Sequence, residues 1–256
     1  MHLLTIITIT YNAEQYLNRT LNSVRTAILS TKDAAQIEYL VIDGESKDDT
    51  LKIARQYPEM ITKIVSEPDR GLYDAMNKGL ALATGKYVWF LNAGDEIYDK
   101  NVLFQLFEKL ETSADVLYSD AMLVRNDGSE VGLRSKFTPH DLPKDLKWQD
   151  FAMGMKVCHQ AFIAKKSIAP YFDATNLSAD IDWEIECLKK AKAVQFLNFI
   201  LCKYLMGGIS IKNHRRSLLD RFKVLKKHFG LIPASWNQIL IFWRGFWFVR
   251  SNGKYW

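Results

Sequence analysis

Polar and charged side chains follow four apolar segments that have the composition of buried strands. The segments cover residues 3–10, 37–43, 61–66 and 86–91 and are rich in β-branched and aromatic residues. The side chains that end or follow them include Thr10, Tyr11, Asn12, Asp43, Arg70, Gly71, Asn92, Ala93 and Asp95. One such group alone is typical of a turn or a helix cap. Because ligands of open α/β sheets bind beyond the carboxyl ends of the strands, the four groups together predict a binding site at that edge.

The residue types at this edge favour one class of ligand. The sequence contains neither a G-x-G-x-x-G nor a G-x-x-x-x-G-K-[ST] motif, which disfavours dinucleotide and P-loop phosphate sites. Carboxylates reach phosphates through a divalent cation. They also accept hydrogen bonds from ribose hydroxyls and from the N–H of a pyrimidine ring. We therefore expect this edge to bind a nucleoside diphosphate together with Mg²⁺ or Mn²⁺.

Helical segments alternate with these strands over roughly the first 120 residues. Helices are expected after Asn12 and after Ser46, which are both candidate caps, and over 71–83 and 100–110. A fifth strand is expected over 115–118. Strands that alternate with helices predict an α/β fold, with a mostly parallel, doubly wound sheet and right-handed crossovers.

The alternation loosens after Asp120. A hairpin is expected over 123–135, because Asn126, Asp127 and Gly128 form a turn sequence. A long loop over 137–155, a helix over 178–193, a strand over 194–204 and helices over 212–229 and 235–249 complete the prediction. We expect one α/β domain over 1–210, with halves of about 1–120 and 121–210, and a helical C-terminal extension over 211–256.

Charge is distributed unevenly along the chain. The 256 residues carry a net charge of +5, and the 48% hydrophobic and 25% charged residues exclude a disordered, collagen-like or disulfide-stapled protein. Residues 1–210 have a net charge of −4, whereas 211–256 contain ten basic residues and a single acidic one, Asp220. The three cysteines are far apart in the sequence, which predicts free thiols in a reducing compartment.

Several long stretches resemble family 2 of the glycosyltransferases, whose fold is called GT-A. The stretches are TIITITYNAEQYLNRTLNSV, YLVIDGESKDDT, EPDRGLYDAMNKGLALATGKYVWFLNAGD, SADIDWEIECL and GGIS, and they span roughly residues 3–210. The resemblance implies an inverting, usually metal-dependent enzyme that moves a sugar from a nucleotide-sugar, often a UDP-sugar, to an acceptor hydroxyl. It makes 1–120 the nucleotide-sugar half and 121–210 the acceptor half.

The resemblance also implies roles at the donor site. Thr10, Tyr11 and Asn12 match a segment that wraps the nucleotide base and ribose. Asp43 matches an aspartate that pairs with the pyrimidine ring, and Arg70 with Gly71 matches a loop near the base and the diphosphate.

A departure from the family pattern concerns the metal motif. Residues 92–95 occupy the position of the DxD motif but read NAGD, so only Asp95 keeps its charge. Asn92 and Ala93 then belong to the donor site, with Asn92 bonding a ribose hydroxyl. Asp95 is the expected metal ligand, and His159 or a water molecule is expected to assist it.

The general base is expected in the segment that matches the ED pair of the family. Ala179 replaces the glutamate, and Asp180 keeps the aspartate. Asp180 opens a predicted helix, where the helix dipole favours the ionised form that a base needs. Asp182 is the second candidate for the base. The alternative is that Asp180 only caps the helix or supports its first turn.

The C-terminal extension has the composition of a membrane-surface element. Basic residues precede a helix rich in Trp and Phe, a pattern typical of interfacial helices on anionic lipid. The helix is too short and too interrupted to span a bilayer, and no secretory signal is visible. We expect a cytoplasmic protein that lies peripherally at the inner face of the cytoplasmic membrane. Packing of the aromatic residues on the domain is the alternative, and the acidic body disfavours nucleic acid as a partner.

The resulting functional hypothesis is an inverting transfer from a UDP-sugar to a glycan or a lipid-linked acceptor, in the synthesis of a cell-surface polysaccharide or lipid-linked glycan. Two alternatives stay open. A non-catalytic nucleotide-sugar-binding module fits the altered NAGD motif. A nucleotidyltransferase also uses a metal and a nucleotide on a similar sheet.

Overall fold

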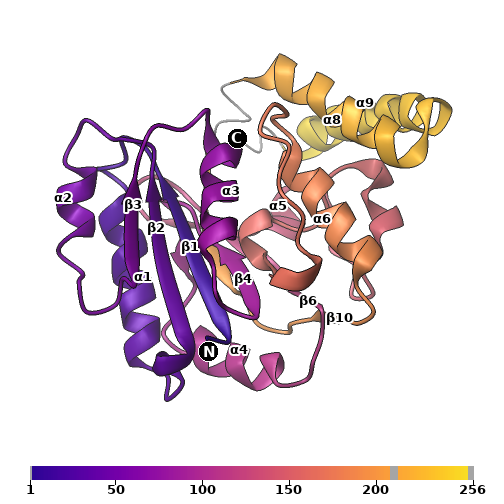
Figure 1. Ribbon diagram of the computed structural model, residues 1–256. Helices are drawn as coiled ribbons and strands as arrows, with labels where there is room; N and C mark the ends of the chain where they lie inside the picture. The colour runs from indigo at the N-terminus through magenta and orange to yellow at the C-terminus, as the bar shows by residue number, and fades with distance from the viewer. Residues whose placement is uncertain (1, 208–212, 253–256) are drawn as a thin grey trace.

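The central sheet of the computed structural model has seven strands in the order β10-β6-β9-β4-β1-β2-β3 (Figure 1). The structure describes residues 2–207 and 213–252. The strands of this sheet are β1 (Leu4–Thr10), β2 (Ile37–Asp43), β3 (Lys63–Ser66), β4 (Tyr87–Phe90), β6 (Val116–Tyr118), β9 (Phe162–Lys165) and β10 (Val194–Phe196). The pairs of β1 with β2 and β4, of β2 with β3 and of β6 with β10 are parallel. The predicted mostly parallel α/β sheet is therefore confirmed.

One strand of this sheet was not predicted. Strand β9 inserts between β4 and β6 and runs antiparallel to both. It has only four residues, FIAK, and three of them are buried. Such a short apolar run carries no periodicity that separates a strand from a loop, so its pairing partners determine its conformation.

Helices cover both faces of the sheet. The α-helices described over residues 2–207 are α1 (Leu17–Leu29), α2 (Thr50–Ala54), α3 (Leu72–Leu82), α4 (Val102–Leu110), α5 (Arg134–Phe137) and α6 (Ala179–Lys190). Of these, α5 packs against a second sheet. Figure 1 shows α3 on the near face of the sheet and α1 on the opposite face. All seven residues of β1 and all seven of β2 are buried. Burial on both faces explains why these strands consist mostly of apolar and β-branched residues.

A second sheet has the strand order β5-β11-β7-β8. Its strands are β5 (Glu96–Ile97), β11 (Cys202–Leu205), β7 (Ala121–Val124) and β8 (Glu130–Leu133). The antiparallel β7–β8 pair confirms the predicted hairpin. The single strand predicted over 194–204 is wrong, because β10 and β11 belong to different sheets. The chain turns between them, where the N–H of Leu201 donates to the hydroxyl of Ser119 at 3.0 Å.

Both predicted helix caps are wrong. Helix α1 begins only at Leu17, and Oδ1 of Asn12 accepts a hydrogen bond from the N–H of Lys47 at 2.9 Å instead. Helix α2 begins at Thr50, and the hydroxyl of Ser46 donates to Asp43. Asn12 thus bonds to the loop after β2, and Ser46 bonds to the end of the strand before it, so neither side chain caps a helix.

The C-terminal extension forms α8 (His214–Phe229) and α9 (Leu231–Asn252). Leu225, Ala234 and Ile241 form a small cluster between them, to which Met153 and Phe229 add. The proposed boundary at 210/211 lies outside the described residues, as does the GGIS match at 207–210 apart from Gly207. Within 2–207 and 213–252, no helix is long and apolar enough to cross a membrane. The three cysteines are free, as predicted, and all three are buried.

Candidate active site

Three strand-end loops meet at one edge of the central sheet. Parallel pairing places Thr10 at the end of β1 beside Asp43 at the end of β2. The next residues stay together, because the N–H of Gly44 donates to the carbonyl of Thr10 at 3.0 Å. On the other side of β1, the N–H of Ala93 donates to the carbonyl of Ile9 at 3.0 Å. The segments that follow β1, β2 and β4 therefore lie side by side.

Asp43 holds together the loop that follows β2. Its carboxylate is 1% exposed and accepts hydrogen bonds from the hydroxyls of Ser46 at 2.5 Å and Ser66 at 2.6 Å. The hydroxyl of Ser46 also accepts a hydrogen bond from the N–H of Asn12 at 2.8 Å. These bonds fix the loop against the end of β1. A contact between Asp43 and a pyrimidine ring stays a prediction.

Gly44 marks a close approach between three loops. A Cβ at this position would lie 2.4 Å from Oδ2 of Asp69 and 3.2 Å from Cδ2 of Tyr11. A side chain at Gly44 would therefore displace one of these neighbours. The ring of Tyr11 is largely exposed, which leaves it open to a stacking partner such as a base. Asp69 lies at this point although the sequence analysis did not select it.

The loop before α3 places Arg70 at the surface. Gly71 precedes the helix with a φ of 121°, a conformation that favours glycine. Its N–H donates to Oδ1 of Asp69 at 2.8 Å. The exposed guanidinium of Arg70 pairs with Asp74 at 3.1 Å. A contact between Arg70 and the donor stays a prediction.

Two polar atoms at this edge are buried without a hydrogen-bond partner. They are Oγ1 of Thr10, at the end of β1, and Oδ1 of Asn92, after β4. Buried polar atoms in native proteins normally have partners, so orphaned ones indicate where a ligand or ion contributes. Both residues were predicted to bind the donor.

Gly94 explains why the third position of the NAGD motif has no carboxylate. Its φ is 104°, and a Cβ there would lie 2.7 Å from Cδ2 of Leu205. The N–H of Gly94 donates to the hydroxyl of Thr20 in α1 at 2.9 Å. Both the backbone conformation and the contact with β11 therefore require glycine.

Asp95 is held between the two sheets. Its carboxylate is 4% exposed, and Oδ1 accepts a hydrogen bond from the N–H of Leu205 at 2.9 Å. Burial raises the pKa of Asp95 to about 7. A cation beside the carboxylate would favour the charged form that burial opposes.

The residues at this edge fit a divalent cation. They provide the carboxylate of Asp95 and the unpartnered amide oxygen of Asn92. Mg²⁺ is usually held by one or two carboxylates together with substrate phosphates, so two protein oxygens are an adequate set. In the described part of the chain, only Asp182, Glu186 and His228 bring three His, Cys, Asp or Glu ligand atoms within 4.8 Å of one another. That group lies between α6 and α8.

His159 is enclosed by aromatic rings and lies near a buried glutamate, and the side-chain nitrogens and oxygens of the two residues have no hydrogen-bond partner among the described residues. Its ring stacks on Phe90 and meets Trp183 edge-on. Nδ1 lies 3.7 Å from Oε1 of Glu184, which is 0% exposed. Burial lowers the pKa of His159 to about 3 and raises that of Glu184. The predicted metal role of His159 stays a prediction, while the structure brings the ring to Glu184.

Asp180 is the second residue of α6 and is half-buried. Its Oδ1 accepts a hydrogen bond from the N–H of Ile181 at 2.9 Å. Burial raises the pKa of Asp180. Desolvation therefore outweighs the helix dipole that was expected to favour the ionised form.

Asp182 points to the C-terminal extension. Its Oδ1 lies 2.5 Å from Nε2 of His228 and 2.8 Å from Nζ of Lys227. Burial acts to raise the pKa of Asp182, but the bonds from these two α8 residues outweigh it and lower the pKa. An aspartate two positions away from Asp180 thus has a different environment, since successive helical residues face different directions.

The negative charges of Asp95 and Asp180 both raise the pKa of one tyrosine, Tyr204. Burial raises the pKa of Tyr204 in β11, and the neighbouring Cys158, Asp95 and Asp180 raise it further. The residue predicted to bind the metal and the residue predicted to act as base therefore lie in one electrostatic neighbourhood.

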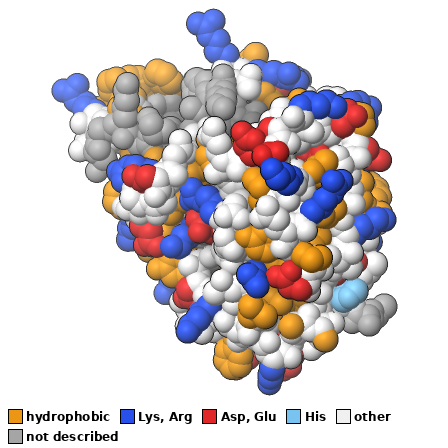
Figure 2. Space-filling model, turned by 90° about the vertical axis from the view of Figure 1, so that its left-hand side faces the viewer, with side chains coloured by type: hydrophobic (Ala, Val, Ile, Leu, Met, Phe, Trp, Pro, Cys, Tyr) orange, Lys and Arg blue, Asp and Glu red, His pale blue; other side chains and the backbone are white. Residues whose placement is uncertain are grey.

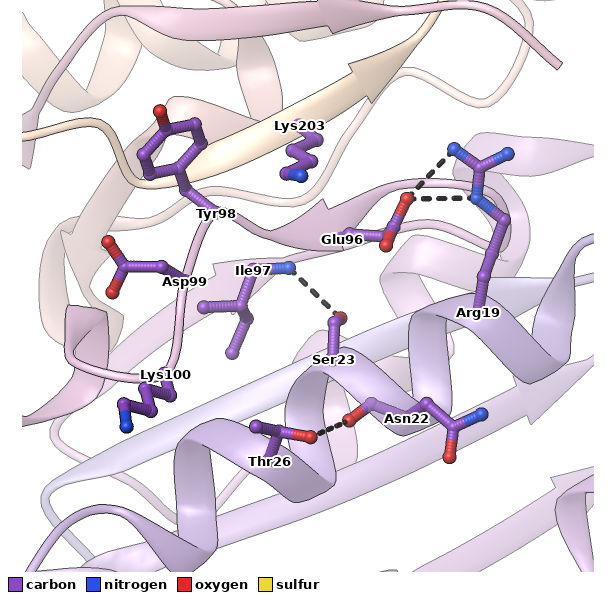
Figure 3. A pocket seen from close by; sticks show the side chains of 10 residues that line it. All are labelled: Arg19, Asn22, Ser23, Thr26, Glu96, Ile97, Tyr98, Asp99, Lys100 and Lys203. Atoms are coloured by element: carbon purple, nitrogen blue, oxygen red, sulfur yellow. Dashed lines mark hydrogen bonds and ion pairs between the residues drawn. The ribbon is translucent and has the colours of Figure 1, made fainter. Parts of the chain in front are cut away.

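A separate pocket of about 400 Å³ lies between α1, β5 and β11 (Figure 3). Figure 3 shows Arg19 of α1 bonded to Glu96, and the hydroxyl of Ser23 accepting from the N–H of Ile97 at 3.0 Å. None of the site residues predicted from the sequence lines this pocket.

Comparison with known families decides the identity. The family model described as "Glycosyl transferase family 2" matches residues 5–172. This chain belongs to that family. The glycosyltransferase is 28% identical over 217 residues to the PGL/p-HBAD biosynthesis glycosyltransferase of Mycobacterium tuberculosis, covering 80% of this chain and 78% of the relative. It is also 28% identical over 259 residues to an uncharacterized glycosyltransferase of Mycobacterium tuberculosis, covering 98% and 94%.

Solved structures confirm the fold of the glycosyltransferase. S. aureus TarS 1–349 in complex with UDP-GlcNAc matches with a TM-score of 0.70 and 20% identity, covering 98% of this chain and 74% of TarS 1–349. Mannosyltransferase PcManGT from Pyrobaculum calidifontis, in complex with GDP-Man and Mn²⁺, matches with a TM-score of 0.61 and 13% identity, covering 98% and 76%. The predicted family, GT-A-like fold and enzyme class are thus confirmed.

Proposed function

We propose that this glycosyltransferase moves a sugar from a UDP-sugar to an acceptor hydroxyl with inversion at the anomeric carbon. The observation that carries the proposal is the convergence of the loops after β1, β2 and β4, where Thr10 and Asn92 have buried oxygens without a hydrogen-bond partner. The TarS structures with UDP-GlcNAc and with UDP support a uridine nucleotide as donor.

The donor would lie across the ends of β1, β2 and β4. Thr10 has an unpartnered oxygen for a ribose hydroxyl, and Tyr11 presents an exposed ring to the base. Asp95, with the amide oxygen of Asn92, would hold a Mg²⁺ or Mn²⁺ ion. Such an ion offsets the negative charge that develops on the departing diphosphate.

The acceptor is activated by a carboxylate. Asp180 accepts the proton of the acceptor hydroxyl while the hydroxyl oxygen attacks the anomeric carbon. The bond between that carbon and the diphosphate oxygen breaks, and UDP leaves from the opposite face. Asp182 is the weaker candidate, because its oxygens already pair with Lys227 and His228.

The acceptor side includes a large exposed aromatic surface on α9. Its exposed apolar residues are Leu231, Ile232, Trp236, Ile239, Leu240, Phe242, Trp243, Phe246, Trp247 and Val249. At helical spacing they fall on one side, which we call the aromatic face, while Ala234 and Ile241 point to the core. Apolar surfaces of this extent indicate an interaction site.

We infer that the aromatic face lies on an anionic membrane. The extension carries a net charge of +9 on a body of −4, and Arg215, Lys226 and Arg250 are exposed on its helices. Figure 2 shows hydrophobic side chains at the upper end of the molecule with Lys and Arg side chains on either side. Trp and Phe beside cations match a lipid interface. A lipid-linked glycan acceptor at the inner face of the cytoplasmic membrane follows from this placement.

A donor panel tests the proposed function. UDP-, GDP- and CDP-sugars are added with Mn²⁺ to the purified protein, and the shift in melting temperature is measured, since ligands of the native state raise apparent stability. UDP-sugars are expected to give the largest shift, and an acceptor is expected to stimulate UDP release. Binding without any transfer would favour the nucleotide-sugar-binding module. Pyrophosphate release from a nucleoside triphosphate would favour a nucleotidyltransferase.

A further inference from the structure

The single acidic residue of the basic C-terminal extension is buried against the catalytic domain. Asp220 of α8 is 2% exposed, whereas most acidic side chains in proteins lie at the surface. Its Oδ1 accepts a hydrogen bond from Nζ of Lys223 at 2.7 Å, and Nε of Arg216 lies 3.6 Å from Oδ2. Both cations belong to α8 itself. The carboxylate also bonds to a segment outside α8.

That segment is the loop over 175–178. Oδ2 of Asp220 accepts a hydrogen bond from the N–H of Leu177 at 3.1 Å, and its carbonyl accepts from Nδ2 of Asn176 at 3.4 Å. Two further bonds accompany them. Ser178 donates through its hydroxyl to the carbonyl of Ser217 at 3.2 Å, and Arg216 donates to the carbonyl of Thr175 at 3.1 Å. Four consecutive residues of the loop therefore bond to α8.

This loop leads directly into the first turn of α6. Ser178 is the residue before the helix, and its side chain bonds to α8 rather than capping α6. Asp180 follows two positions later. The position of Asp180 is thus determined by a loop whose backbone α8 holds.

Helix α3 holds the same segment from the donor side. The hydroxyl of Tyr73 donates to the carbonyl of Leu177 at 3.3 Å. Asn77 makes two bonds with the backbone of Phe172, at 2.9 Å and 2.7 Å. The segment is therefore held between the donor half and the C-terminal extension, and Leu177 contacts both.

We propose that Asp220 is a positioning residue, which sets the loop over 175–178 and through it the carboxylate of Asp180. The inference rests on the proposed role of Asp180 as general base. It makes the extension, expected from the sequence to be a separate unit, a structural part of the acceptor site. Helix α8 also packs on α9. The contact of Asp220 with the loop over 175–178 therefore connects the aromatic face of α9 to the segment that carries Asp180.

Two substitutions separate the hydrogen bond from the charge. Asp220→Ala removes the acceptor for the N–H of Leu177, whereas Asp220→Asn keeps an oxygen acceptor and loses only the negative charge. We expect Asp220→Ala to lower kcat by about 10–100-fold, because small misplacements of catalytic groups have effects of this size. The KM for the UDP-sugar and the Kd for UDP are expected to stay within about twofold, since the donor-site residues lie before α6. Asp220→Asn is expected to restore most of kcat.

Lys223→Ala is the matched control. Its ammonium is mostly exposed and contacts the same carboxylate, but it does not touch the loop. We expect its kcat to equal that of the wild type within about twofold. Should Asp220→Ala not fold, Ser178→Ala replaces it, since that variant removes one loop contact and is expected to lower kcat by about threefold or more at unchanged donor KM.

Two results would overturn the proposal, each measured on folded Asp220→Ala or, if that variant does not fold, on Ser178→Ala. The first is a wild-type kcat. The second is a kcat and a donor affinity that fall together. Failure of the proposed function is distinguishable. If Asp180→Asn retains full activity, Asp180 is not the base, whatever Asp220 does. If Asp180→Asn is inactive and Asp220→Ala is fully active, only the positioning role of Asp220 fails.

Discussion

The backbone N–H of Leu205 donates a hydrogen bond of 2.9 Å to Oδ1 of Asp95, a residue 110 positions earlier in the chain. This bond joins the loop after β4 to the last residue of β11. It also brings the side chain of Leu205 over Gly94, where a Cβ would lie 2.7 Å from Cδ2. The NAGD motif therefore contacts strands of both sheets.

The metal motif gives the first prediction. Asp95→Asn removes the charged ligand and is expected to weaken UDP binding in Mn²⁺ by about 10–100-fold, the effect of losing a charged partner. Asn92→Ala removes one neutral oxygen and is expected to cost less. Titration calorimetry with UDP, in Mn²⁺ and in excess chelator, measures both. Equal UDP affinity in chelator and in Mn²⁺ for the wild type would refute the metal site.

Gly94 gives a stability prediction with an internal comparison. Gly128 has a φ of 84° and no neighbour within 4 Å, so Gly128→Ala is expected to lower the free energy of unfolding by about 1–2 kcal/mol through backbone strain alone. Gly94→Ala adds the contact with Leu205 and is expected to cost about 1–3 kcal/mol more. Urea unfolding measures the two variants. Equal decreases in the free energy of unfolding for the two variants would show that the side chain of Leu205 moves aside at little cost.

Glu38 gives a prediction about pH. Burial acts to raise its pKa, but hydrogen bonds from Thr5 and Thr84 outweigh burial and lower the pKa below its ordinary value of 4.5. A lowered pKa stabilises the folded state above pH 4.5, and the contribution is lost as the pH falls through the folded value. Glu38→Gln is expected to lower the free energy of unfolding by about 1–3 kcal/mol at pH 7, with a smaller difference at pH 3.5.

The control for Glu38 is Glu59→Gln. Glu59 forms an exposed ion pair with Arg25, so its loss is expected to change the free energy of unfolding by less than about 1 kcal/mol at either pH. A Glu38→Gln difference that grows toward low pH would contradict the assigned pKa shift.

Much of the donor side of the fold was predictable from the sequence. The buried strands β1 and β2 are rich in apolar and β-branched residues, and glycine or polar residues follow them. The short strand β9 was not predictable, because its conformation depends on pairing with β4 and β6. The helix starts were not predictable either, because Asn12 and Ser46 bond across loops instead of capping helices. These choices depend on tertiary partners, which local sequence does not encode.

The site was predictable only residue by residue. The resemblance to the family selects Asp95 and Asp180 as candidates, but no local pattern indicates that Asp182 pairs with α8 or that Glu184 is fully buried. Asp220 carried a signal, as the single acidic residue among ten basic ones in the extension. Its partner, the loop before α6, is more than 40 residues away in the chain.

The aromatic face of α9 gives a prediction about membranes. Phe242, Trp243 and Trp247 are 67%, 51% and 58% exposed, so replacing all three by Ser is expected to leave the melting temperature nearly unchanged. The same change is expected to lower binding to phosphatidylglycerol vesicles at least about tenfold, measured by sedimentation. High salt is expected to release the wild type, because exposed charges are screened.

Leu219→Ser is the control for the aromatic face. Leu219 is an exposed apolar residue of α8, outside the aromatic face, so its vesicle binding is expected to match that of the wild type. Two results would contradict the membrane assignment. A triple variant that loses stability would show that the face packs on the domain, and a change from dimer to monomer in light scattering would show that a second copy covers it.

The most direct test of the proposed mechanism compares two neighbouring aspartates in one assay. Asp180→Asn and Asp182→Asn are assayed for acceptor-dependent UDP release from the UDP-sugar selected by the donor panel. Asp180→Asn is expected to lower kcat by about 10²–10⁴-fold at nearly unchanged UDP affinity, the effect of losing a general base. Asp182→Asn is expected to keep kcat within about threefold and to lose stability, because it breaks the pair with Lys227. An active Asp180→Asn enzyme beside an inactive, folded Asp182→Asn enzyme would contradict the assignment of the base.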